Sequence, residues 1–169
     1  MNKRLLTTLM GMVFTVAMVA QTLVIPKTGK YYRIVNQNPD KSVTTGGEVY
    51  GFVIEEDRIT NKLKAVAQGD NAAYSQIWRC MGNGKFYNAL TRRYIGEAYI
   101  SQQMVTSTDA KTLTLENKTK YFIIKSSNGN QLHADNGNNI VGWNDEGNKS
   151  NWWRFEKKAK SRKESSFMY

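Results

Sequence analysis

The sequence has little of what builds disulfides, metal centres and catalytic pairs. Among its 169 residues there is one cysteine, Cys80, and one histidine, His133. A single cysteine excludes an internal disulfide, so packing alone must stabilise the fold. One histidine and one cysteine in separate segments also provide neither a metal cluster nor a nucleophile with its base. We therefore expect no metal and no cofactor. Cys80 alternates with Trp78 in the segment IWRC and is expected to be a small core residue.

Signals of α-helices and of phosphate-binding loops are also missing. After the first twenty residues, no segment sustains a helical apolar period with caps at both ends, and no Gly-rich phosphate loop is present. Short segments rich in β-branched and aromatic residues occur instead, separated by clusters of Gly, Asn and Asp. They predict an all-β chain, and they lie at 30–36, 62–67, 92–100, 112–117 and 120–126.

Carboxylates that could work as a catalytic pair are scarce. Glu55, Glu56 and Asp57 are adjacent, but such a polar run within an insertion is typical of a solvated loop. Asp145 and Glu146 lie in a turn-like segment. Hydrolysis of a glycoside needs two acids at a set separation across a cleft, which the sequence does not establish. The sequence therefore indicates a protein that is not an enzyme.

The long apolar run of this chain lies at residues 5–19, directly after the basic start MNKR. This layout is typical of a secretory signal peptide over residues 1–20, with cleavage between Ala20 and Gln21. The run is shorter than the roughly 20 apolar residues that cross a bilayer. No cysteine directly follows the cleavage point to carry a lipid. We expect the mature protein to be secreted or periplasmic, without stable membrane insertion.

The net charge of +10 does not by itself indicate a nucleic-acid partner. Lys3 and Arg4 leave with the signal peptide and residues 157–164 carry a net charge of four, so the remaining residues carry only +4. Such a modest charge is not the basic patch that nucleic-acid binding requires. Residues 159–169 form a basic, polar and unpatterned end of the chain, which we expect to be disordered.

An internal repeat organises the rest of the chain. The segment SQIWRC at 75–80 returns as SNWWRF at 150–155. Extending this comparison outward gives three strand openings, GKYYRIVNQ, GKFYNALTR and TKYFIIKSS. Three closings follow them in the same order, at Trp78, Leu113 and Trp153. The repeat therefore divides the chain into three units, at about 29–83, 84–118 and 119–158.

Three all-β units of this size predict a closed barrel with pseudo-threefold symmetry, because one unit has too little apolar surface to bury a core alone. We expect the second strand of each unit in the segments between its opening and its closing, at 40–46, 92–97 and 130–135.

The closing segments carry a more specific resemblance. Gln76-Ile77-Trp78 resembles the Gln-x-Trp motif of ricin-type β-trefoil domains, and Asn151-Trp152-Trp153 is a near match. The middle unit departs from the motif with Lys111-Thr112-Leu113. The resemblance covers about residues 27–158 and implies one β-trefoil domain at 21–158, with Trp78 and Trp153 in its core.

The resemblance also implies a carbohydrate-binding role. Sugar sites in ricin-type domains combine a carboxylate after the second strand, an aromatic residue before the closing motif and an amide nearby. A pyranose lays its apolar C–H face on an aromatic ring, while its hydroxyls suit a carboxylate and an amide. The third unit offers this set, and its candidate carbohydrate-binding residues are Asp135, Trp143, Asn148 and Asn151.

These residues also have a purely structural explanation. Asp135 is an ordinary turn residue, Trp143 is suited to packing under the barrel, and His133 is expected to be a strand residue rather than a ligand. The other two units look poorer, because Tyr74 in the first and Tyr99 and Asp109 in the second have unconvincing positions. We therefore expect at most one shallow site, with a glycan as the partner.

A second hypothesis is protein binding, as in a protease inhibitor or an adhesin. Residues 46–72 lengthen the first unit by nearly twenty residues relative to the second, and insertions on a rigid β scaffold often carry recognition. Part of this segment, VYGFVI, is apolar enough to form a strand. Glycan binding predicts an exposed Trp143 beside Asp135, whereas protein binding predicts exposed apolar surface within 46–72.

Overall fold

The computed structural model describes residues 22–45, 47–69 and 73–158. The predicted signal peptide at 1–20 and the predicted disordered tail at 159–169 lie outside these ranges. The described chain forms fourteen strands and three short 3-10 helices, which confirms the all-β prediction. None of its helices is long and apolar enough to span a bilayer.

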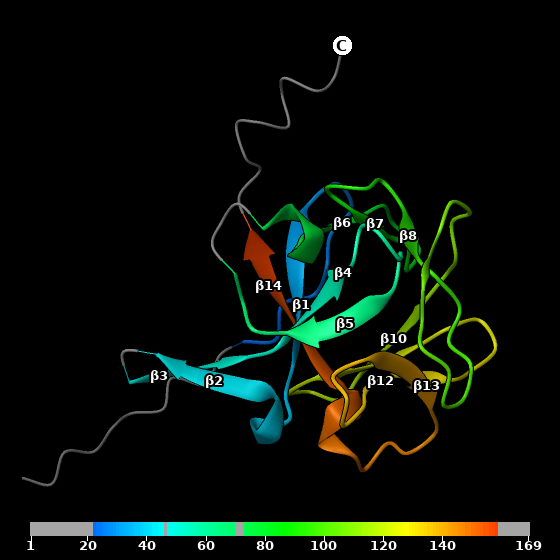
Figure 1. The fold of residues 1–169 in the computed structure, drawn as a ribbon. Coiled ribbons are helices and arrows are strands. Elements are labelled where there is room, and N and C mark those ends of the chain that lie inside the picture. The colour runs from blue at the N-terminus through cyan, green and yellow to red at the C-terminus, as the bar shows by residue number, and fades with distance from the viewer. Residues whose placement is uncertain (1–21, 46, 70–72, 159–169) are drawn as a thin grey trace, which may run out of the picture.

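Twelve strands form one curled sheet, four from each predicted unit (Figure 1). The first unit contributes β1 (Tyr31–Asn36), β4 (Val53–Glu56), β5 (Leu63–Val66) and β6 (Trp78–Cys80). The second contributes β7 (Phe86–Asn88), β8 (Tyr94–Ile95), β9 (Thr106–Ser107) and β10 (Thr114–Asn117). The third contributes β11 (Phe122–Lys125), β12 (Gln131–Ala134), β13 (Ile140–Trp143) and β14 (Trp152–Lys158). Each set of four lies within the bounds that the repeat predicts.

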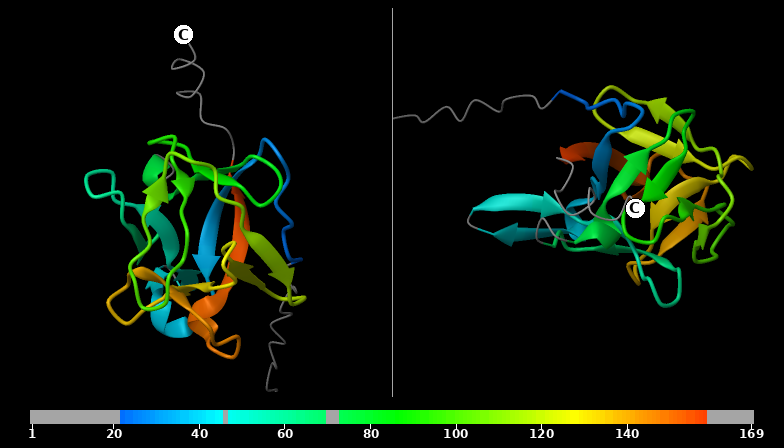
Figure 2. Two further views of the ribbon diagram at one scale, coloured as in Figure 1. Left: turned by 90° about the vertical axis from the view of Figure 1, so that its right-hand side faces the viewer. Right: turned by 90° about the horizontal axis from the view of Figure 1, so that it is seen from above.

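Two further strands form a separate hairpin that projects from the body of the molecule (Figures 1 and 2). They are β2 (Ser42–Thr45) and β3 (Glu48–Gly51), and they follow the 3-10 helix η1 (Pro39–Lys41). The prediction that 40–46 holds the second strand of the first unit is therefore wrong, because β4 takes that place. The physical difference is burial, since β4 buries three of its four side chains whereas β2 buries none.

The first and last units close on each other through β1 and β14, which pair antiparallel along the whole of β1 (Figure 1). All six residues of β1 are buried because β14, β6 and β4 pair with it. Cys80 is buried in the core that these strands enclose, as expected. The segment 92–100 is less regular than predicted, because only Tyr94 and Ile95 lie in a strand.

Both closing-motif tryptophans are fully buried, as the resemblance implies. The Trp78 indole N–H donates to the carbonyl of Ile54 at 3.0 Å, and the Trp153 indole N–H donates to that of Leu132 at 2.8 Å. Each bond joins the end of a unit to its second strand. Leu113 is buried at the corresponding place in the middle unit, where it has no donor for such a bond.

Three hairpins, one from each unit, meet on one side of the core. The Leu63 N–H donates to the Met104 carbonyl at 2.9 Å, and the Met104 N–H donates to the Ile140 carbonyl at 2.7 Å. All three side chains are at most 1% exposed, so they occupy equivalent core positions. This arrangement is the pseudo-threefold architecture of a β-trefoil.

Candidate functional site

Trp143 lies on the outer surface of the β12–β13 hairpin. Ile140 and Gly142 alternate with it and face inward, so the pleat turns the Trp143 side chain outward, where it is 37% exposed. Its ring lies nearly parallel to that of His133 on the paired strand, with centroids 5.5 Å apart and an interplanar angle of 27°. The two rings form a short aromatic surface at the edge of the third unit.

Asn151 hydrogen-bonds the His133 ring and fixes its orientation. It belongs to the 3-10 helix η3 (Lys149–Asn151) and is fully buried. Its amide nitrogen donates to the Gln131 side-chain oxygen at 2.8 Å and to the Asp145 carbonyl at 2.5 Å. Its oxygen therefore faces His133 Nδ1, which is 2.5 Å away and must donate. In the neutral ring, Nε2 is then left as an acceptor that a ligand hydroxyl can use.

Asp135 lies at the turn of the same hairpin, away from Trp143. Trp143 pairs with Gln131, four residues before Asp135, which is about 13 Å along a strand. The Asp135 carboxylate accepts the backbone N–H of Asn139 at 2.8 Å. Lys41 Nζ reaches over from η1 and donates to the Asp135 carbonyl at 2.6 Å. Asp135 is thus half-buried in a turn that the first unit helps to fix.

Asn148 stabilises the helix that presents Asn151. Its side-chain oxygen accepts the Ser150 N–H at 2.9 Å, which caps η3. Trp143 thus stacks on His133, and His133 bonds to Asn151. Asn148 caps the helix that contains Asn151. The structure does not bring Asp135 to the same point.

The chain around Tyr99, from the second unit, lies against the same hairpin. The Gly142 N–H donates to the Tyr99 carbonyl at 3.0 Å, which holds the chain around Tyr99 against β13 beside Trp143. A Cβ on Gly142 would lie 2.5 Å from that carbonyl, so only glycine permits the approach. Tyr99 is 54% exposed and Ile100 is 45% exposed. We refer to Trp143 and His133 as the hairpin surface.

The first unit places different residues at the equivalent positions. Because Trp78 and Trp153 bond to Ile54 and Leu132, the next residues, Glu55 and His133, correspond. The Gln76 amide nitrogen donates to the Glu55 carboxylate at 2.7 Å, just as Asn151 holds His133. The counterpart of Trp143, however, is Val66.

The expectation that residues 55–57 form a solvated loop is wrong for its first two members, which lie in β4. Glu56 is 1% exposed and accepts the hydroxyl of Thr106 at 2.5 Å. Glu55 is half-buried against Gln76. An alignment of VIEE with QLHA, both before a turn, is the sequence signal that would have found them.

Apolar side chains are exposed within the described part of 46–72. Val49 and Tyr50 in β3 are 68% and 36% exposed, and Ile59 in the β4–β5 turn is 85% exposed. Among the strands described within 46–72, β3 lies outside the twelve-stranded sheet, whereas β4 and β5 belong to it. In the described ranges, no group of three or more His, Cys, Asp or Glu side chains is arranged to hold a metal ion.

Solved structures with similar folds include lectins and a designed threefold symmetric protein. The Rhizoctonia solani agglutinin matches 80% of this chain and 99% of its own, with a TM-score of 0.62 and 17% identity. A Macrolepiota procera ricin B-like lectin in complex with lactose matches 79% and 99%, with a TM-score of 0.62 and 15% identity. ThreeFoil, a designed threefold symmetric protein, matches 74% and 96%, with a TM-score of 0.57 and 13% identity.

No family model matches the chain, and no curated protein sequence is significantly similar to it. At these low identities the structural likeness establishes the fold. The chain has the β-trefoil fold of ricin B-like lectins.

Proposed function

We propose that this protein is a non-catalytic carbohydrate-binding module that recognises a glycan through the hairpin surface of its third unit. The observation that carries the proposal is the exposed Trp143 ring stacked on His133, whose Nδ1 is held by the buried Asn151. The fold it shares with ricin B-like lectins, one of them bound to lactose, supports the same class of ligand.

The chemistry of the hairpin surface suits a sugar ring. The apolar C–H face of a pyranose packs on Trp143, while His133 Nε2 accepts a hydroxyl proton. Asn151 acts as a positioning residue, because its amide is saturated by protein contacts. Asp135 contacts a further sugar of an oligosaccharide that lies along the hairpin. Asn148 contributes indirectly, because it caps η3, the helix that contains Asn151.

Binding at such a shallow surface is weak for one sugar, with a dissociation constant on the order of millimolar, or roughly 4 kcal/mol. Useful avidity then comes from a repeated glycan or from several copies of the module. We also propose that residues 1–20 direct export, as the basic start and the apolar run indicate. N-terminal sequencing of the protein recovered outside the cell tests that part, with Gln21 as the expected first residue.

A glycan array with the protein displayed multivalently tests the binding proposal. Trp143→Ala and His133→Ala are run beside Val66→Ala, the matched change at the equivalent position of the first unit, and all variants are first shown to be folded. We expect binding to fall by about tenfold or more in the first two variants and to persist in the third. An Asp135→Ala variant should weaken only longer glycans.

Two results would count against the proposal. One is an array with no signal for the unmodified protein. The other is equal loss of binding in Val66→Ala and Trp143→Ala, which would remove the hairpin surface as the site.

Protein binding by the β2–β3 hairpin is the second candidate. The exposed Val49 and Tyr50 on this projecting hairpin favour it. A silent glycan array together with a protein partner whose binding is lost in Val49→Ser and kept in Trp143→Ala would favour this function over the first.

A further inference from the structure

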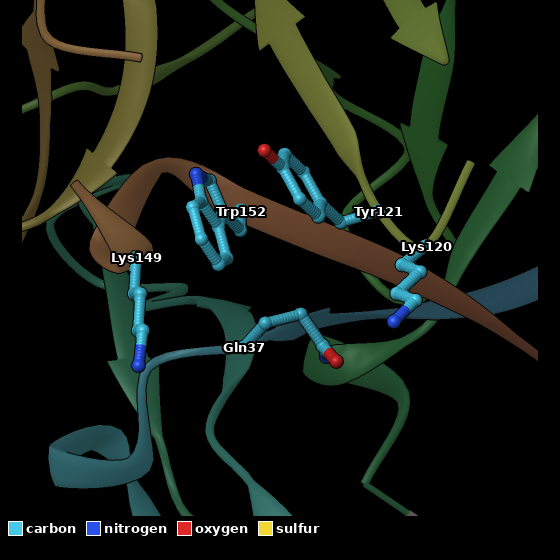
Figure 3. A pocket seen from close by; sticks show the side chains of 5 residues that line it. All are labelled: Gln37, Lys120, Tyr121, Lys149 and Trp152. Atoms are coloured by element: carbon cyan, nitrogen blue, oxygen red, sulfur yellow. The ribbon is translucent and has the colours of Figure 1, made fainter. Parts of the chain in front are cut away.

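A second concave surface lies where the first and third units meet. Its volume is about 260 Å³, and it is lined by Gln37, Lys120, Tyr121, Lys149 and Trp152 (Figure 3). It shares no residue with the hairpin surface. We refer to these five residues as the lysine cleft.

The aromatic wall of the lysine cleft is held in place by the fold. Tyr121 and Trp152 stack in parallel, with centroids 4.1 Å apart and an interplanar angle of 9°. Trp152 pairs with Ile123 through the β14 backbone, and its indole N–H donates to the Glu146 carbonyl at 2.8 Å. Because these contacts fix the Trp152 ring, it offers a preformed apolar surface to a ligand.

The two lysines of the cleft differ from their neighbours in having no acidic partner. Lys125 bonds to the carboxylates of Glu116 and Glu146 at 2.7 and 2.9 Å, and Lys118 bonds to Glu146 at 3.1 Å. Lys120 and Lys149 are exposed, and neither ammonium group forms a hydrogen bond or ion pair with another residue in the described ranges. Glu116 and Glu146 are thus paired with Lys118 and Lys125, whereas no ion pair in the described ranges involves Lys120 or Lys149.

Gln37 adds a neutral polar group to the same cleft (Figure 3). Its amide nitrogen donates to the Val35 carbonyl at 3.3 Å, so its side-chain oxygen remains an acceptor for a hydroxyl. The cleft therefore combines an aromatic face, two ammonium groups and a hydroxyl acceptor. Its volume is below the range of sites for drug-sized ligands, so it suits one small ring rather than a long segment.

We propose that the lysine cleft is a second binding site, specific for an acidic sugar residue that carries a carboxylate. The sugar ring packs on Trp152, its carboxylate lies between Lys120 and Lys149, and a hydroxyl donates to Gln37. A neutral sugar of the same shape forms the ring and hydroxyl contacts but leaves both ammonium groups without a counter-ion. This site goes beyond the proposed glycan recognition by the hairpin surface and does not depend on it.

NMR titration of the purified protein with D-galacturonate tests the proposal, with the methyl ester of galacturonic acid as the neutral matched probe. The chain has four tryptophans, so each assigned indole N–H signal reports on one place. We expect the acid to shift the Trp152 signal. The affinity for the ester, measured from the same signal, should be at least about tenfold lower. Added salt should weaken the response to the acid.

Two double variants with equal loss of charge separate specific from general attraction. The double variant Lys120→Ala with Lys149→Ala should lower the affinity for galacturonate, measured at Trp152, by about tenfold. The double variant Lys30→Ala with Lys62→Ala should change this affinity less than about twofold. Lys30 and Lys62 are exposed and lie elsewhere on the molecule. The indole spectrum shows at the same time that each variant is folded.

The proposal is overturned if the Trp152 signal does not move, if the ester acts as strongly as the acid, or if both double variants lose the response equally. A shift confined to Trp143 would also overturn it while supporting the hairpin surface. A shift at Trp152 with a silent Trp143 would support this site, while the glycan array remains the test of the hairpin surface, so the two proposals fail separately.

Discussion

The first and third units build the same frame around different outward residues. In both, a buried tryptophan of the closing motif donates to the second strand, Trp78 to Ile54 and Trp153 to Leu132. In both, a buried side-chain amide of that motif hydrogen-bonds the strand residue that follows this acceptor. The pairs are Gln76 with Glu55 and Asn151 with His133. The units differ in what that frame presents, which is Glu55 and Val66 in the first, and His133 and Trp143 in the third.

This difference separates what the repeat needs for folding from what it can do at the surface. Side chains that face the core keep their roles because every unit must bury them against the other two. Outward positions are free of that requirement, so one unit can present an aromatic surface while its counterpart has a carboxylate and no ring. Function in a β-trefoil therefore has to be argued position by position rather than for the fold.

The largest expected effect separates an inward from an outward tryptophan of the third unit. Trp153→Ala should lower the free energy of unfolding by about 3–5 kcal/mol, because it leaves a large cavity and removes the donor to the Leu132 carbonyl. Trp143→Ala should change it by no more than about 1 kcal/mol, since that ring is partly exposed. Urea denaturation measures both.

Trp78→Ala is the matched control in the first unit and should lower the free energy of unfolding as much as Trp153→Ala does. Equal losses in Trp143→Ala and Trp153→Ala would mean that Trp143 belongs to the core frame.

A smaller effect distinguishes the two motif amides. Asn151→Ala and Gln76→Ala should each cost about 1–3 kcal/mol in urea denaturation, because each leaves buried polar partners without a hydrogen bond. Their effects on glycan binding should differ. Asn151→Ala should weaken it because His133 loses the contact that fixes its tautomer, whereas Gln76→Ala should leave it unchanged. Loss of binding in both variants would show that the comparison between the units has been drawn at the wrong residues.

The repeat made the fold predictable from sequence. Its bounds enclose the observed strands of all three units, and Cys80 is buried as its alternation with Trp78 predicts. A comparison of the chain with itself gives the bounds of the units, whereas the core positions of Trp78 and Trp153 follow from the resemblance to the Gln-x-Trp motif.

The surface was less predictable for two physical reasons. The segments 40–46 and 53–56 both look like strands, and only their burial shows that the second belongs to the repeat, so Glu55 was misplaced. Tyr99 lies against the third unit through a backbone contact with Gly142, which spacing along the sequence does not reveal. Asp135 was chosen as a residue after a strand, although His133 within that strand lies closer to the aromatic ring.

Transferring the aromatic ring to the first unit tests whether the frames are equivalent. Val66→Trp places an indole at the counterpart of Trp143, near Glu55, and this half-buried position should accept it at a cost of no more than about 1–3 kcal/mol. We expect a new indole N–H signal that responds to the glycan bound by Trp143, with an affinity on the order of millimolar. A new signal that stays fixed while that of Trp143 shifts would show that Glu55 cannot take the place of His133.

The smallest expected effect concerns two carboxylates, the half-buried Asp57 in the turn between β4 and β5, and the exposed Glu146 after β13. In the third unit, Lys125 and Lys118 lower the pKa of Glu146. In the first unit, the backbone N–H groups of Ile59 and Thr60 lower the pKa of Asp57. Both carboxylates therefore stabilise the folded state above the ordinary carboxyl range, and this contribution is lost as the pH falls through their folded pKa values.

Salt should separate the two carboxylates, because high salt weakens exposed ion pairs such as those of Glu146 but leaves backbone hydrogen bonds in place. We expect the pKa of Glu146 to rise toward its ordinary value in high salt, while that of Asp57 stays low. NMR titration of the side-chain carboxyl signals at low and high salt measures both. At low salt, Lys125→Met should also raise the pKa of Glu146, because it removes one of the two ammonium groups that lower it. If salt moved the pKa of Asp57 as far as that of Glu146, the first hairpin would depend on ion pairs rather than on its own backbone, and this contrast between the units would fail.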